Sequence, residues 1–258
     1  MQPNPTVDAP ALAQIKPVVR YVDDEQAVID THFRLKPHLP ESGIQNPKRV
    51  RVLLEVENDD GFHDETFAHV ELDHLCGMVR MQMVLPEMWW PAGMGSQALY
   101  NVNLTLLKGR RILDKVNTTV GLTSVRVTDS HFDTRTFMVN GKPCEIHTIV
   151  PVDHVHEDAL LPASGDSLIV VRDHYGSDSL FAAADLAGIL MVQCVPIAAD
   201  GKPERELADQ ISRLSSHPSL AGWCVSPQGR LSKRMAQQLK ELDPIHPIIE
   251  HSPGNWAA

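Results

Sequence analysis

The stretch that decides the fold is His217-Pro218-Ser219-Leu220-Ala221-Gly222-Trp223-Cys224-Val225-Ser226-Pro227-Gln228. Its middle, residues 221–225, is a short apolar run typical of a buried parallel strand, and a helical pattern precedes it. In parallel α/β sheets the groups that perform chemistry lie where loops leave the carboxyl ends of strands. This sequence offers Ser226, Pro227 and Gln228 there, and a Gln amide cannot transfer a proton at neutral pH.

Strand-like and helix-like patterns alternate on both sides of this stretch. We expect strands at residues 168–171, 189–192, 221–225 and 247–250, with helices at 177–187 and 203–214 between the first three. A further helix, with Leu231, Met235 and Leu239 in register, is expected to end at Asp243-Pro244. This alternation predicts a parallel sheet with right-handed crossovers. A complete (β/α)8 barrel needs about 250 residues, so we expect residues 131–258 to form a partial, half TIM-type (β/α) barrel.

The amino-terminal part of the chain has a different pattern. Seven or eight short runs rich in β-forming residues lie between residues 15 and 130, separated by turn signals such as Asn58-Asp59-Asp60-Gly61. This pattern predicts an immunoglobulin-like β-sandwich. Residues 1–14, rich in Pro and Ala, are expected to be a flexible leader. The predicted fold class is therefore multidomain, β plus α/β.

Composition, charge and motifs narrow the range of functional classes that the chain could belong to. The net charge of −10 and the lack of a Lys/Arg-rich run argue against a nucleic-acid partner. No apolar window approaches a membrane span and no signal-peptide pattern begins the chain, so we expect a cytoplasmic protein without a membrane partner. The sequence has no Walker, G-x-G-x-x-G or G-x-S-x-G motif, and we predict no cofactor.

The densest cluster of possible metal ligands is Asp153-His154-Val155-His156-Glu157-Asp158. In an extended strand His154 and His156 lie on the same side, a usable spacing for zinc. The sequence fixes no third ligand, and a solvated loop is the favoured interpretation of the cluster. We therefore predict no metal site, and the alternative of a metal-dependent activity would require stoichiometric metal in the purified protein. The four widely spaced cysteines are interpreted as buried thiols.

Several segments together resemble glycoside hydrolase family 2, in particular its β-mannosidase and exo-glucosaminidase-like branch. The order and spacing of the segments carry the resemblance, which spans roughly residues 86–247. They are PEMWWPAGMG (86–95), GLTSV (121–125), FMVNGKP (137–143), VRDHY (171–175), DLAGILM (185–191) and HPSLAGWC (217–224).

The resemblance also shows where this sequence departs from the family. It implies that the fourth barrel strand should end in Asn-Glu, with the Glu as proton donor, where this sequence has Pro227 and Gln228. The family's nucleophilic Glu lies on a seventh strand that the sequence does not reach, and the family's jelly-roll domain is absent. Retaining hydrolysis needs two carboxylates about 5 Å apart. We therefore predict a truncated relative that is a pseudoenzyme: a binding, scaffold or assembly protein with residual carbohydrate binding.

The candidate substrate-binding residues lie at predicted strand ends: Arg172, Asp173, His174 and Tyr175 after the second strand, and Trp223 in the fourth. Each also has a structural interpretation. Arg172 can pair with carboxylates at the sheet edge, His174 and Tyr175 can pack the loop, and Trp223 can face the helices. Similarly, Trp89 and Trp90 are interpreted as sandwich packing.

The alternative function is an active exo-glycosidase of β-mannosidase type, a retaining O-glycosyl hydrolase. Its carboxylates would come from another chain or from Asp173, Glu204 or Glu250, of which Glu250 is the best candidate because it ends the last predicted strand. In either case an open parallel edge would leave backbone groups unpaired. We expect a second copy, a partner protein or the sandwich to cover it.

Overall fold

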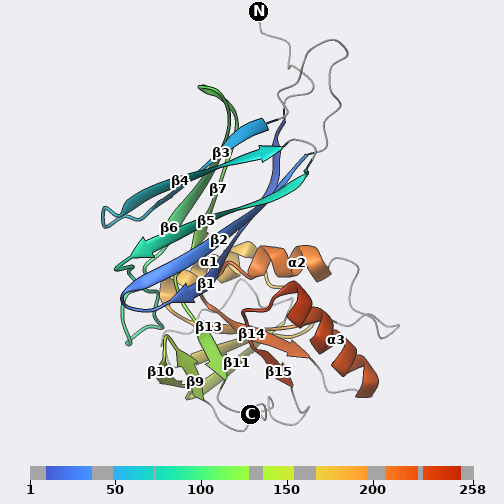
Figure 1. The fold of residues 1–258 in the computed structure, drawn as a ribbon. Coiled ribbons are helices and arrows are strands. Elements are labelled where there is room, and N and C mark those ends of the chain that lie inside the picture. The colour runs from blue at the N-terminus through green and yellow to red at the C-terminus, as the bar shows by residue number, and fades with distance from the viewer. Residues whose placement is uncertain are drawn as a thin grey trace, which may run out of the picture.

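The computed structural model describes residues 10–36, 49–71, 74–127, 136–153, 167–196, 207–225 and 229–250. These residues form a β-sandwich and, below it in Figure 1, an α/β unit whose helices α1–α3 lie beside a parallel sheet. Among the described residues no helix is long and apolar enough to cross a membrane.

The sandwich consists of two antiparallel sheets, in the strand orders β1-β2-β5 and β4-β3-β6-β7. Its strands are β1 (Leu12–Val22), β2 (Gln26–Leu35), β3 (Arg49–Glu57), β4 (His63–Glu71), β5 (Cys76–Val84), β6 (Tyr100–Lys108) and β7 (Arg111–Val120). Alternation places one face of each strand inside; in β3 the buried residues are Val50, Val52, Leu54 and Val56. The predicted β-sandwich is therefore present.

The α/β unit is built on a parallel sheet in the order β11-β12-β13-β14-β15. Its elements are β11 (Thr148–Val152), β12 (Ser167–Val171), α1 (Asp178–Ala187), β13 (Leu190–Cys194), α2 (Leu207–Leu214), β14 (Leu220–Val225), α3 (Gly229–Leu242) and β15 (Ile248–Glu250). Every residue of β12 and β14 is buried, which explains why these segments read as continuous apolar runs. The predicted alternation of strands and helices is confirmed for β12 through β15.

A small antiparallel sheet, β10-β9-β8, lies beside the parallel sheet. It contains β8 (Val125–Val127), β9 (Thr136–Val139) and β10 (Lys142–Glu145), and the predicted Asn140-Gly141 turn joins β9 to β10. Both turn residues have positive φ angles, 48° and 78°, as a tight hairpin requires. Residues 125–127, which fall within the predicted sandwich, pair with β9 instead.

The loop that carries Trp89, Trp90 and Pro91 joins the two units. Trp89, interpreted above as sandwich packing, belongs to this junction instead. Trp89 is fully buried, and it packs with residues of the parallel sheet and the small sheet, including Phe137 and Leu168. Its indole Nε1–H donates to the backbone carbonyl of Asp185, 2.8 Å away. Three residues further on, the backbone N–H of Ala92 donates to the carbonyl of Gly188 at 2.9 Å. This loop therefore fixes the sandwich to the start of β13.

The cysteines agree only in part with the prediction of buried thiols. Cys144 and Cys224 are buried and Cys194 is half-buried, but Cys76 is exposed at the start of β5. Cys194 and Cys224 are partners in the β13–β14 register. Hydrogen bonding to Cys194, together with burial, raises the pKa of the Cys224 thiol far above its ordinary value. Cys224 is therefore a protonated packing residue rather than a nucleophile.

Candidate functional site

The candidate site is the carboxyl edge of the parallel sheet, where the strand ends meet. The register aligns Val171, Gln193, Trp223 and Ile248 in one row across β12, β13, β14 and β15. Residues that follow this row in each strand leave the sheet at the same edge. The loop 172–177 starts there, beside the ends of β13 and β14, as the sequence predicted.

Gln193 holds this loop in place. Its side chain is fully buried, and its Oε1 accepts the backbone N–H of Gly176 at 3.0 Å. Its Nε2 donates to the carbonyls of His174 and Cys194, both at 2.7 Å. An amide supplies both an acceptor and two donors, so one side chain satisfies a loop N–H and two carbonyls at once. The loop is therefore fixed from beneath by the neighbouring strand.

Arg213 of α2 holds the other end of the same loop. Its guanidinium donates to the carbonyl of Gly176 at 2.7 Å and to the Asp178 carboxylate at 2.6 Å. Ser177 caps α1 by accepting the N–H of Leu180 through Oγ at 3.2 Å. Gly188 ends α1 in the left-handed region, at φ 68°. Gln193 and Arg213 therefore hold the loop 172–177, and the helix α1 that follows it is capped at both ends.

The four candidate residues of the loop have different exposures. Asp173 is exposed, whereas Arg172, His174 and Tyr175 are half-buried. Tyr175 packs against the core on the helical face of the sheet, and the Arg172 backbone N–H donates to the carbonyl of Val152 at 3.3 Å. The loop therefore presents a guanidinium and a carboxylate at the edge, which are groups that hydrogen-bond sugar hydroxyls, whereas both ring nitrogens of His174 are buried.

Trp223 does not lie in this site. Its side chain is fully buried in the core between the sheet and the helices, as the helix-facing interpretation expects, and it leaves no surface for a ligand. Its Nε1–H donates to Asp243 at 2.8 Å. Burial alone would raise the pKa of Asp243, but His246, the Trp223 hydrogen bond and Lys16 outweigh it and hold that pKa well below its ordinary value. Its assignment to substrate binding is corrected to a structural role.

Several predicted residues lie outside the described part of the chain. Pro227, Gln228, Glu204, His154 and His156 belong to segments that the structure does not describe. The backbone of Glu250 ends β15 opposite Val225, at the carboxyl edge, but its side chain is not described. Within the described residues no group of three or more His, Cys, Asp or Glu side chains could hold a metal ion.

Sequence reasoning missed two positioning groups. Gln193 directly follows the strand predicted at residues 189–192 and was assigned no role, although an amide at the end of a buried strand signals a buried hydrogen-bonding role. Asp185 was noted only within a family-like segment. Its carboxylate accepts the backbone N–H of Ser219 at 3.1 Å and pairs with His217 Nδ1 at 2.6 Å, connecting the end of α1 to the start of β14.

Comparison with known proteins shows which family the chain is similar to. The family model described as Glycosyl hydrolases family 2 matches residues 29–122, from within β2 to just beyond β7. Among solved structures, a β-glycosidase from Bacteroides vulgatus superposes on 93% of this chain with a TM-score of 0.73 at 16% identity, using 33% of its own chain. A glycosyl hydrolase family 2 member from Bacteroides cellulosilyticus gives the same coverage and TM-score at 14% identity, over 35% of its chain.

Curated relatives point to a branch within that class. An exo-β-D-glucosaminidase of Streptomyces avermitilis is 26% identical over 66% of this chain and 22% of its own length. A β-mannosidase B of Aspergillus clavatus is 26% identical over 66% of this chain and 23% of its own length. The chain thus spans less than a quarter of each of these glycosidases. The predicted resemblance to glycoside hydrolase family 2, in its β-mannosidase and exo-glucosaminidase branch, is confirmed.

Proposed function

We propose that this chain is a carbohydrate-binding member of glycoside hydrolase family 2 that performs no hydrolysis by itself, and that its parallel sheet is part of a (β/α) barrel. The barrel assignment is supported by five parallel strands, of which β12 to β15 are joined by helices, and by superposition on a family 2 glycosyl hydrolase. In such a barrel the carboxyl edge of the sheet is the face that binds substrate.

The observation that carries the proposal is the sequence after β14. The strand ends at Val225, and Pro227 and Gln228 occupy the positions where the family resemblance calls for Asn and the proton-donating Glu. Removing a general acid typically costs about 10²–10⁴-fold in rate. An amide at this position can still hydrogen-bond a sugar hydroxyl. The chemistry is lost at this position, while the capacity to bind is retained.

Binding is assigned to the loop 172–177. The loop carries Arg172, Asp173 and His174. Gln193 and Arg213 hold its backbone through three hydrogen bonds of 2.7–3.0 Å to Gly176 and His174. A loop that is fixed before the ligand arrives loses less conformational entropy on binding. Such a loop suits recognition of a sugar ring whether or not bond cleavage follows.

Hydrolysis is tested with aryl β-mannoside, β-galactoside and β-glucosaminide at high protein concentration. We expect no turnover by the chain, and the same result for Glu250→Gln. Turnover that Glu250→Gln abolishes would instead establish the alternative, an exo-glycosidase that uses a non-standard carboxylate. A double variant, Pro227→Asn with Gln228→Glu, restores the family's residues at this position but supplies only one of the two carboxylates that retaining hydrolysis needs.

Binding is tested by calorimetry with β-mannose and β-glucosamine oligosaccharides. Arg172→Gln should weaken binding about tenfold, because hydrogen bonds from a charged donor contribute about 1.5–3 kcal/mol. Arg34→Gln removes an exposed guanidinium on β2, far along the sequence from the loop, and should have no effect. Failure of the unaltered chain to bind any of these sugars would contradict the proposal.

We further propose that a second copy of the chain covers the edges of the parallel sheet. Among the described strands β11 and β15 each pair on one side only, and β15 contributes Ile248 and Ile249 to the two faces of the sheet. An edge strand left open exposes unpaired backbone groups that favour association. Size-exclusion chromatography with light scattering should show a dimer, and a monomer at high concentration would contradict this part of the proposal.

A further inference from the structure

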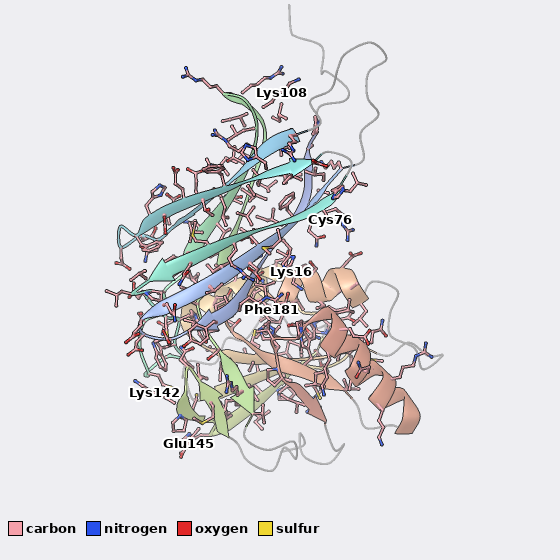
Figure 2. All side chains as sticks on the ribbon, in the orientation of Figure 1. Lys16, Cys76, Lys108, Lys142, Glu145 and Phe181 are labelled. Atoms are coloured by element: carbon pink, nitrogen blue, oxygen red, sulfur yellow. The ribbon has the colours of Figure 1, made fainter. Side chains whose placement is uncertain are left out.

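A cavity lies between the sandwich and the α/β unit, away from the carboxyl edge of the parallel sheet. Its volume is about 330 Å³, and it is lined by β1 residues on one side and by residues 215–218 and 241–246 on the other. Figure 2 places Lys16 at this junction, between the lower strands of the sandwich and the helices. A cavity of this size lies at the lower end of the range for small-molecule sites.

The carboxylates near this cavity already have partners. Asp243 accepts the Trp223 indole N–H and pairs with His246 Nδ1, both at 2.8 Å. Asp30, on β2 behind the lining, pairs with Arg20 at 3.0 Å and with Arg80 at 2.6 Å. The remaining acid of the lining, Glu241, is exposed and accepts a hydrogen bond from Gln237 on its own helix.

Lys16 differs from these groups. It lines the cavity and is half-buried, but within the described chain its ammonium makes no hydrogen bond or ion pair. Burial lowers the pKa of Lys16; nearby Asp243 raises it in part, and Arg20 lowers it further. An ammonium that is partly removed from water in this way is stabilised by a counter-charge.

A second group in the lining also has an unused hydrogen-bonding capacity. Ser215 Oγ is buried and has no partner among the described residues. The lining also contains Arg20 and the histidines His32, His217 and His246. Nδ1 of His217 and of His246 already pairs with a carboxylate, which leaves their Nε2 atoms as possible donors. The cavity therefore combines an ammonium, a hydroxyl and imidazoles, while its acids are engaged elsewhere or exposed.

We propose that this cavity binds a small oxyanion, a phosphate or carboxylate group, with the Lys16 ammonium as its counter-charge and the Ser215 hydroxyl as a hydrogen-bond donor. Such a ligand would supply the missing partners of both groups at once. Because the lining comes from β1 and from the loops around β14 and α3, binding would also stabilise the junction of the two units. This site is separate from the carboxyl edge and does not depend on the sugar-binding proposal.

The test uses inorganic phosphate and malonate as probes, with the full chain, at constant ionic strength. Calorimetry should detect one saturable site, and the probe that binds tells whether the group is a phosphate or a carboxylate. Lys16→Met should weaken binding about tenfold or more, because a charge-assisted hydrogen bond is lost. Lys108→Met is the matched control; Lys108 is exposed at the far end of the sandwich (Figure 2), and its loss should leave binding unchanged.

The Lys16→Met variant should fold at least as stably as the unaltered chain, since it removes a buried charge but keeps the length of the side chain. Its melting temperature without ligand shows that lost binding is not lost structure. Ser215→Ala should weaken binding less than Lys16→Met does. Absence of saturable binding of both probes, or equal binding by Lys16→Met and the unaltered chain, would overturn the proposal.

Discussion

Replacing Gln193 by Leu tests whether the candidate loop is held by its neighbouring strand. The substitution keeps approximate size in a fully buried position but removes three hydrogen bonds of 2.7–3.0 Å. It leaves the buried N–H of Gly176 and the carbonyl of His174 without their partner, and each such group costs about 1–3 kcal/mol. Because Leu gains some apolar burial, we expect a net loss of about 2–4 kcal/mol in the free energy of unfolding.

Urea unfolding followed by circular dichroism measures this loss. With a slope of about 2–3 kcal/mol/M, the midpoint should fall by about 1 M. Hydrogen exchange should also show faster exchange of the Gly176 amide, which a general loss of core packing would not single out. Gln237→Leu removes an exposed amide on α3 and should change stability by less than about 0.5 kcal/mol. Equal effects of the two variants, with an unchanged Gly176 amide, would refute the role assigned to Gln193.

Two further predictions concern the framework around the site. Gly188→Ala should destabilise the chain by about 2–4 kcal/mol, because its φ is +68° and a Cβ would lie 2.5 Å from the backbone nitrogen of Ala92. Gly109→Ala, with φ +61° and no atom within 4 Å, carries the backbone strain alone and should cost about 1 kcal/mol in the same urea assay; equal losses would contradict the steric argument. Asp243→Asn should cost about 1–3 kcal/mol at neutral pH. Because the folded state lowers the pKa of Asp243 below its ordinary 3.8, the stabilisation is present above that pH and is lost as pH falls through the lower, folded-state value, so the two midpoints should converge in acid.

Local patterns in the sequence predicted many elements of the fold. The Asn140-Gly141 turn, the Ser177 cap and Gly188 at the end of α1 are each fixed by backbone chemistry within a few residues, and the structure shows all three. The apolar runs of β12 and β14 likewise follow from burial on both faces of a parallel strand. Such features depend on short-range sterics and hydrogen bonding, which neighbouring residues determine.

Contacts between side chains of different elements were harder to predict from the sequence. Trp89 was assigned to the sandwich because it lies in that part of the sequence, but its indole N–H reaches the carbonyl of Asp185, 96 residues away. The pattern of residues around Trp223 left two orientations open, and packing against the helices with Asp243 as hydrogen-bond partner decided between them. The separation along the chain of the residues involved explains why periodicity could not locate these contacts.

The sequence by itself determined the strand and helix alternation, the sandwich and the amide at position 228, because each depends on residue type and local spacing. Only the tertiary structure decided that Gln193 holds the loop 172–177, that Trp89 joins the two units, and that Lys16 lines a cavity whose acids are otherwise engaged or exposed. The physical reason is that hydrogen bonds and buried charges select partners by distance in space. Residues far apart in sequence meet only after the sheets have packed.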